Sequence, residues 1–246
     1  MSVGVAFIHG GLHTGWCWER VQRLVRVPTI APDLPGRGSR PAVLSGLHIG
    51  DFVTAMRRDI EATHWTDVVV VAHSLGGLTA LGLAAELPSV RHVVFVSCVT
   101  PPAGVRPVDA LAQPLRAYLT RRMTNAVRTG GTMSIPRPVA RRFFCSDLDA
   151  SDTRLVLDRC VPDAPHILLD RTPHSGLPST VGRTWIRLTK DRAISPPVQD
   201  RMRSNVTPVD VVEIAAGHNA MISQPESVAA VINRVAAAAG GHTNRS

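Results

Sequence analysis

The chain of 246 residues contains few aromatic side chains and almost no lysine. Phe, Trp and Tyr together make up 4% of it, with one tyrosine, and Lys190 is the only lysine. Arginine therefore carries nearly all of the basic charge behind the net charge of +8. Basic proteins that bind nucleic acid gather Lys and Arg on one face, often beside aromatic residues. Here the arginines are dispersed, so arginine-biased codon usage, as in a bacterium with a GC-rich genome, explains them better than a nucleic-acid partner.

Cysteine is also scarce, and no two cysteines are spaced as a C-x-x-C pair. This pattern argues against a zinc site and against a small disulfide scaffold. We therefore expect no metal site, and free cysteines that pack as small apolar residues. The four are Cys17, Cys98, Cys145 and Cys160.

No apolar run approaches the ~20 residues that a membrane-spanning helix requires. The start of the chain, MSVGVAFIHGG, lacks the basic region, the long apolar region and the cleavage site of a signal peptide. We therefore expect a cytoplasmic protein without a membrane partner. Hydrophobic residues make up 44% of the chain, which predicts a globular domain with a substantial core.

Short apolar runs alternate with segments of helical periodicity, which predicts a mostly parallel, doubly wound sheet of about six strands. Aspartate at position 51 is expected to cap the second helix. The predicted strands cover residues 3–10, 27–34, 67–72, 92–97, 183–189 and 209–215, and the predicted core helices cover residues 16–25, 51–63, 78–87, 196–206 and 225–239.

The alternation stops after the fourth predicted strand. Residues 100–182 are rich in Pro and Arg, and only residues 109–127 and 149–161 have a helical pattern. Ligands of such sheets bind beyond the carboxyl ends of the strands. We therefore expect two core segments, residues 1–99 and 183–246, and a helical cap over residues 100–182 that forms a lid.

One serine follows the third strand, in Ala72-His73-Ser74-Leu75-Gly76. A serine on a sharp strand-to-helix turn points off the top of the sheet, and small residues must flank it, which gives the G-x-S-x-G nucleophile elbow. Ala72 in place of the first glycine is a mild departure. The turn also directs the Leu75 N–H toward a developing oxyanion.

The base and the acid of such a site follow the serine in the chain, in the order serine, acid, histidine. Asp191 lies in the loop after the fifth strand, and His218 lies in the loop after the sixth. The other nine histidines do not close a strand after Asp191, and Asp33 is the alternative acid. Gly11, in the His9-Gly10-Gly11 turn after the first strand, is the candidate for the second oxyanion N–H.

Five stretches of the sequence are similar to a known family: HGGLHTGWCWERV, APDLPGRG, AHSLGG, KDRAISPPVQDRM and GHNAMISQPE. With them the chain resembles the α/β-hydrolase superfamily, and within it the branch of plant methyl-ester esterases and hydroxynitrile lyases. The resemblance covers both core segments. It implies a cofactor-free esterase that cleaves a small-molecule carboxylic ester through an acyl-enzyme on Ser74.

Three further functions stay open beside the esterase. The first is a tailoring enzyme of secondary metabolism, such as a lactonase, thioesterase or cyclase, on the same triad. The second is a hydroxynitrile lyase; lyases of this branch carry threonine at the position of Gly10 and lysine at the position of Asn219, and this sequence has neither. The third is a non-catalytic ligand receptor. The sequence leaves the oligomeric state open, a homodimer included.

Overall fold

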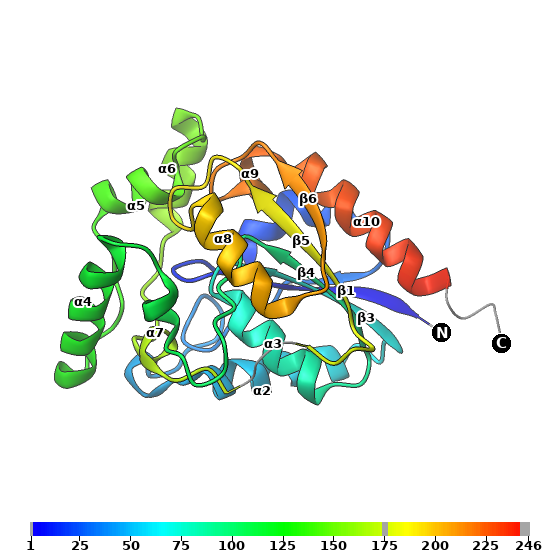
Figure 1. Ribbon diagram of the computed structural model, residues 1–246, viewed down its shortest axis with the longest axis horizontal. Helices are drawn as coiled ribbons and strands as arrows, with labels where there is room; N and C mark the ends of the chain where they lie inside the picture. Colours follow the sequence, from blue (N-terminus) through cyan, green and yellow to red (C-terminus); the bar gives the residue numbers. More distant parts are fainter. Residues whose placement is uncertain (1, 174–176, 242–246) are drawn as a thin grey trace.

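The computed structural model describes residues 2–173 and 177–241, and its centre is a six-stranded sheet (Figure 1). Every strand pairs parallel to its neighbours, in the order β2-β1-β3-β4-β5-β6. The predicted parallel, doubly wound architecture is therefore confirmed. The strands are β1 (Val3–Ile8), β2 (Thr29–Ile30), β3 (Asp67–His73), β4 (Val90–Val96), β5 (Gly182–Leu188) and β6 (Asp210–Ile214).

Helices cover both faces of the sheet, which is why β3 is buried along its whole length and apolar from Val68 to Ala72. Val68 and Val70 face one core cluster, and Val69 and Val71 face the other. The first cluster includes residues of α2 (Ile49–Glu61), α3 (Gly76–Glu86) and α8 (Pro196–Arg203). The second includes residues of α1 (Glu19–Gln22), α9 (Ala220–Ser223) and α10 (Pro225–Gly241). No helix among the described residues is long and apolar enough to cross a membrane.

Three local predictions differ from the structure. The helix expected over residues 16–25 is a 3-10 turn, η1 (Gly15–Trp18), followed by the four residues of α1. The strand expected over residues 27–34 shrinks to β2, because the prolines at 28 and 32 cannot donate to a ladder. Asp51 does not cap α2: it is the third helical residue, and its carboxylate accepts from the backbone N–H of His48, the actual cap, at 2.8 Å.

Residues between β4 and β5 form a group of helices at one end of the molecule (Figure 1). The arrowheads of β5 and β6 point toward that end. Two helices were expected here, and α5 and α7 were missed. The elements are η3 (Pro107–Ala110), α4 (Leu115–Thr129), α5 (Arg137–Phe144), α6 (Ala150–Arg159) and α7 (His166–Leu169); η2 (Leu44–Gly46) and η4 (Ser204–Val206) complete the description.

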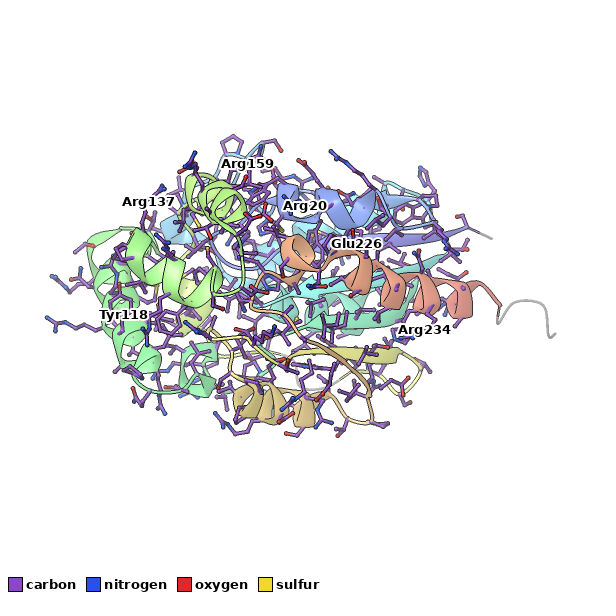
Figure 2. The ribbon with its side chains drawn as sticks, turned by 90° about the horizontal axis from the view of Figure 1, so that it is seen from above. Arg20, Tyr118, Arg137, Arg159, Glu226 and Arg234 are labelled. Atoms are coloured by element: carbon purple, nitrogen blue, oxygen red, sulfur yellow. The ribbon has the colours of Figure 1, made fainter. Side chains whose placement is uncertain are left out.

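Side-chain contacts fasten this helical segment to the rest of the chain. Arg20 of α1 donates to the Asp152 carboxylate of α6 at 2.8 Å, and the guanidinium of Arg159 lies 5.1 Å from the ring centre of Trp16. Figure 2 shows Arg20 and Arg159 near each other where α6 meets the core. These contacts hold the helical segment on the end of the sheet where the strands finish.

The close packing of α2 against α3 depends on Gly82, so a larger residue at this position is expected to lower stability. A methyl group at Gly82 would lie 2.5 Å from the nearest γ carbon of Val53. Gly82→Ala should therefore destabilise the protein by about 1–3 kcal/mol, although alanine is the better helix former. Chemical denaturation measures this, and Val53→Ala in the same chain should recover much of the loss because it restores the space. Additive effects of the two substitutions would contradict the packing argument.

Candidate active site

Ser74 lies on the turn between β3 and α3, with its backbone in the left-handed region at φ +53°. Neighbouring backbone leaves no room for a side chain at Gly76 or Gly77. A Cβ at Gly76 would lie 2.9 Å from the carbonyl oxygens of Ile8 and His9, and one at Gly77 would lie 2.9 Å from that of Val99. The local geometry is thus the sharp strand-to-helix turn that the sequence predicts, with Ser74 held at the carboxyl end of the sheet.

Ser74, His218 and Asp191 form a hydrogen-bonded chain. The Ser74 Oγ lies 3.1 Å from His218 Nε2, and His218 Nδ1 lies 2.7 Å from Asp191 Oδ2. All three residues are buried. His218 follows β6 and Asp191 follows β5, in the loops where the sequence predicts them. The arrangement lets an imidazole take the serine proton while a carboxylate orients it.

The Asp191 carboxylate is held by four donors, counting His218. Its Oδ1 accepts from the backbone N–H groups of Ala193 at 2.7 Å and Ile194 at 3.0 Å, and its Oδ2 accepts from Ser97 Oγ at 2.7 Å. The sequence analysis missed Ser97, whose only signal is its place at the end of the fourth strand. These bonds fix the orientation of the carboxylate, which accepts from the imidazole N–H.

Asp33, the alternative acid, lies elsewhere. Its carboxylate accepts from the Gly15 N–H at 2.8 Å and from the Ser39 N–H at 2.8 Å. It therefore organises the loops after β1 and β2 and has no contact with His218 among the described residues.

The two proposed oxyanion donors lie on either side of Ser74. Gly11 and Leu75 line the same cavity as Ser74 and His218. Both residues lie outside the regular helices and strands. Within the described residues, the backbone N–H of neither one donates to a protein acceptor. Their backbone groups are therefore free to bind an oxyanion, and this role stays a prediction.

Three further histidines surround the site as neutral, structural groups. His9 accepts from the Leu34 N–H at 3.1 Å, and burial lowers its pKa to about 3. Burial lowers the pKa of His13 to about 4 and that of His73 well below its usual value. His73 Nε2 lies 2.9 Å from the His218 carbonyl oxygen, and His13 Nδ1 lies 2.9 Å from that of Gly11. They hold backbone groups of the site in place. His174 and His242 lie outside the described residues.

The cavity above Ser74 has a volume of about 60 Å³ and is almost entirely apolar. None of the described residues that line it is charged, and its polar side chains are Ser74, His13 and His218. The helical segment contributes much of the wall: Leu111, Leu115, Leu119, Met133, Ile135, Val139, Phe143, Phe144 and Leu168.

One group of described residues has the ligand atoms to hold a metal ion, and it lies outside this cavity. Its atoms, from His48, His166 and Asp170, lie within 4.8 Å of one another. His48 Nδ1 lies 2.8 Å from the Asp170 carboxylate, so the group already links α7 to the start of α2 as a hydrogen-bonded contact. It takes no part in the serine site.

Comparison with known proteins decides the family. A family model described as the alpha/beta hydrolase family matches residues 5–231. The chain belongs to the alpha/beta hydrolase family. This hydrolase is 26% identical to methylesterase 9 of Arabidopsis thaliana, over 90% of this chain and 93% of that protein. It is 28% identical to a carbendazim hydrolyzing esterase of Nocardioides sp., over 64% of this chain and 67% of that protein.

The fold of the hydrolase agrees with solved structures. An extracellular alpha/beta-hydrolase from a Paenibacillus species superposes with a TM-score of 0.83 at 16% identity, over 94% of this chain and 98% of that one. Its description states homology to tobacco salicylic acid binding protein 2. Together with the methylesterase relatives, this confirms the predicted fold, the methylesterase-like branch and the class of ester-cleaving hydrolase.

A half-buried histidine, His92, is expected to make the hydrolase less stable in acid. Burial lowers the pKa of His92 from 6.5 to about 4, and its Nε2 lies 2.9 Å from Thr184 Oγ1. Below pH 6.5 the unfolded chain binds a proton that the folded chain excludes, so stability falls as the pH drops from 6.5 toward 4. His92→Gln should make this loss smaller, measured as the free energy of unfolding between pH 7 and 4.

The control for that measurement is His64→Asn, at an exposed histidine with φ +58°. Asparagine tolerates a left-handed backbone, so this variant removes an imidazole without new strain. It should keep the wild-type pH dependence. An unchanged slope in His92→Gln would show that His92 protonates equally in the folded and unfolded chains.

Proposed function

We propose that this hydrolase cleaves neutral, apolar carboxylic esters, with Ser74 as nucleophile, His218 as base and acid, and Asp191 as the orienting carboxylate. The observation that carries the proposal is the hydrogen-bonded chain from Ser74 to Asp191 beneath a cavity whose described lining residues carry no charge. The geometry supplies each group that acyl transfer needs.

In the first half-reaction, His218 Nε2 takes the Ser74 proton as Oγ attacks the carbonyl carbon of the ester. The N–H groups of Gly11 and Leu75 bind the oxyanion of the tetrahedral intermediate. His218 then returns the proton to the departing alkoxide, and the acyl group stays on Ser74. In the second half, His218 takes a proton from the water that attacks the acyl-enzyme. It then gives this proton to Ser74 Oγ as the bond to the acyl group breaks, which releases the acid and restores the serine. Losing one oxyanion donor in such a site costs about 3–4 kcal/mol.

The cavity favours substrates that carry no charge. A carboxylate or ammonium group placed there would lose its hydration and find no countercharge among the described lining residues. The walls are rich in leucine, isoleucine, methionine and phenylalanine, and the Phe144 ring lies 5.4 Å from the His218 ring. An aliphatic or aryl acyl group fits this surface.

Residues 100–182 serve as the cap in this proposal, and residues 1–99 and 183–246 as the catalytic core. The support is that η3 and α4 to α7 lie at the carboxyl end of the sheet and that five of their residues, among others, line the cavity: Leu115, Leu119, Val139, Phe143 and Leu168. Substitution of these side chains is expected to change the preference among acyl groups.

The surroundings of Gly10 and Asn219 argue against a cyanohydrin lyase. A Cβ at Gly10 would lie 2.8 Å from Ser74 Cβ and 2.9 Å from His73 Nδ1, so threonine does not fit there without movement of the backbone. Asn219, at the position of the lyase lysine, is neutral and buried, and it donates to the Phe144 carbonyl at 3.1 Å. Among the described residues, no cationic side chain lines the cavity to accept cyanide.

A lactonase, thioesterase or cyclase would use the same triad and the same acyl-enzyme, and would differ from an esterase in its substrate. A ligand receptor would bind its ligand in the same cavity without rapid turnover. The cytoplasmic location, the absence of a nucleic-acid or membrane partner and the homodimer stay predictions.

Covalent labelling tests the nucleophile. A fluorophosphonate should modify Ser74, mapped by mass spectrometry of the peptides, and Ser74→Ala should abolish both labelling and ester turnover. His218→Ala should lower kcat by about three orders of magnitude or more, and Asp191→Asn by less, because the carboxylate orients the imidazole without transferring the proton. Circular dichroism controls for folding. An adduct on another residue would refute the assignment.

A substrate panel tests the class of ester. The enzyme should hydrolyse p-nitrophenyl butyrate, discriminate at least about tenfold in kcat/KM against the charged p-nitrophenyl hemisuccinate, and release no cyanide from mandelonitrile. The discrimination follows from the desolvation of a carboxylate in an uncharged cavity. Equal rates on the two esters would contradict the neutral-substrate proposal, and cyanide release without ester turnover would replace the esterase by a lyase.

A further inference from the structure

A buried ion pair joins the helical cap to the loop that carries Gly11. Asp163, between α6 and α7, is fully buried, and its Oδ1 pairs with Nη2 of Arg37 from the loop after β2. Arg37 is 2% exposed, and its guanidinium lies 4.9 Å from the ring centre of Phe52. Burial lowers the pKa of Arg37 to about 10, so the guanidinium is charged at neutral pH and balances the carboxylate.

The second carboxylate oxygen of Asp163 binds the loop itself. Asp163 Oδ2 accepts from the Leu12 N–H at 3.0 Å, and the Val161 N–H donates to the Leu12 carbonyl at 3.0 Å. Both backbone groups of Leu12 are therefore bound by the cap. Leu12 needs this support because its φ is +63°, a conformation that costs free energy in a residue with a side chain.

Leu12 follows Gly11 directly, so the same contacts set the direction of the Gly11 peptide. A Cβ at Gly11 would lie 3.2 Å from Asp163 Oδ2, which shows how closely the carboxylate approaches this peptide. On its other side, His13 Nδ1 lies 2.9 Å from the Gly11 carbonyl oxygen. The backbone of Asp163 is in turn paired with that of Met133, which lines the cavity.

We propose that Asp163 is a positioning residue for the oxyanion hole: through the Leu12 N–H it holds the Gly11 N–H in place, and the ion pair with Arg37 fixes the orientation of the Asp163 carboxylate. This inference rests on the proposed function, since it assumes an oxyanion at Gly11. It makes the hole dependent on the cap, because the carboxylate that fixes the loop comes from the cap.

A contribution to folding stability does not explain why the chain buries the Arg37–Asp163 ion pair. Among the described residues, Nε and Nη1 of Arg37 have no hydrogen-bond partner, so the guanidinium is only partly satisfied. Replacing a buried ion pair by apolar side chains of similar volume is often neutral for stability or stabilising. Such a replacement would, however, remove the acceptor for the Leu12 N–H.

That difference gives a matched pair of variants. Arg37→Met with Asp163→Leu removes both charges and the acceptor, whereas Arg37→Met with Asp163→Asn removes both charges and keeps an oxygen that can accept from Leu12. We expect similar melting temperatures for the two. On p-nitrophenyl butyrate, the leucine variant should have a kcat about ten- to a hundredfold below that of the asparagine variant, with KM changed by about threefold or less.

Affinity for a trifluoromethyl ketone gives a readout that a purely structural role would not move. Its adduct with Ser74 carries an oxyanion, so the inhibition constant should rise in the leucine variant by about the same factor as kcat falls. Asp170→Asn is the control, because it weakens another cap-to-core contact, with His48, and leaves Leu12 untouched. It should keep the wild-type kcat.

Equal kcat values and equal inhibition constants in the two double variants would overturn the proposal. A fall in the kcat of Asp170→Asn as large as that in the leucine variant would also overturn it. If the leucine variant does not fold, Asp163→Asn and Asp163→Ser in the otherwise wild-type chain make the same comparison, since the serine hydroxyl is too short to reach Leu12. Failure of the esterase proposal looks different: the wild-type protein would then show no turnover that Ser74→Ala removes.

Discussion

The site depends on one backbone constraint, the left-handed turn at Ser74 at the end of the central strand. β3 must end, reverse into α3 and leave the serine hydroxyl above the sheet within two residues. Glycine at positions 76 and 77 makes the turn possible, because a Cβ at either would lie 2.9 Å from a backbone carbonyl oxygen at the end of β1 or in the loop after β4. The strain at Ser74 is thus held by neighbouring strands on both sides, and the hydroxyl keeps one position when the imidazole approaches.

Parallel pairing explains why residues far apart in sequence meet at this turn. In a parallel sheet all strands end at the same edge, so Gly11 after β1, Ser97 after β4, Asp191 after β5 and His218 after β6 converge there. Ser97, two backbone N–H groups and His218 Nδ1 share the two oxygens of the Asp191 carboxylate. The imidazole of His218 is then fixed at Nδ1, which leaves Nε2 for the serine proton.

Much of this core was predictable from sequence because its signals are local. The apolar run of β3, the small residues around Ser74 and the order of acid and histidine each follow from short patterns, and the structure brings Ser74, Asp191 and His218 into contact. Their catalytic roles stay predictions. The shortened β2 and the capping of α2 by His48 were missed because prolines and side-chain competition act at single residues.

The helical segment between β4 and β5 was less predictable because tertiary contacts decide its structure. α5 has a strong polar-apolar contrast over only eight residues, and α7 is a single turn, so neither has a pattern long enough to stand out. The ion pair of Arg37 with Asp163 joins residues 126 positions apart in the chain. No spacing rule predicts such a pair, and the conformation of Leu12 that it supports is unusual for a leucine.

The electrostatics of the site separate two kinds of buried polar group. His9, His13 and His73 are kept neutral by burial, so they can hold backbone groups close to Ser74 without raising the local charge. The second kind is the ion pair of Arg37 with Asp163, in which each charge balances the other outside the walls of the cavity. In the proposed mechanism, a neutral cavity beside the Gly11 and Leu75 N–H groups favours the one negative charge that forms during acyl transfer, because those N–H groups are the donors proposed for it. Ground-state esters carry no such charge, so these donors stabilise the transition state more than they stabilise the bound substrate.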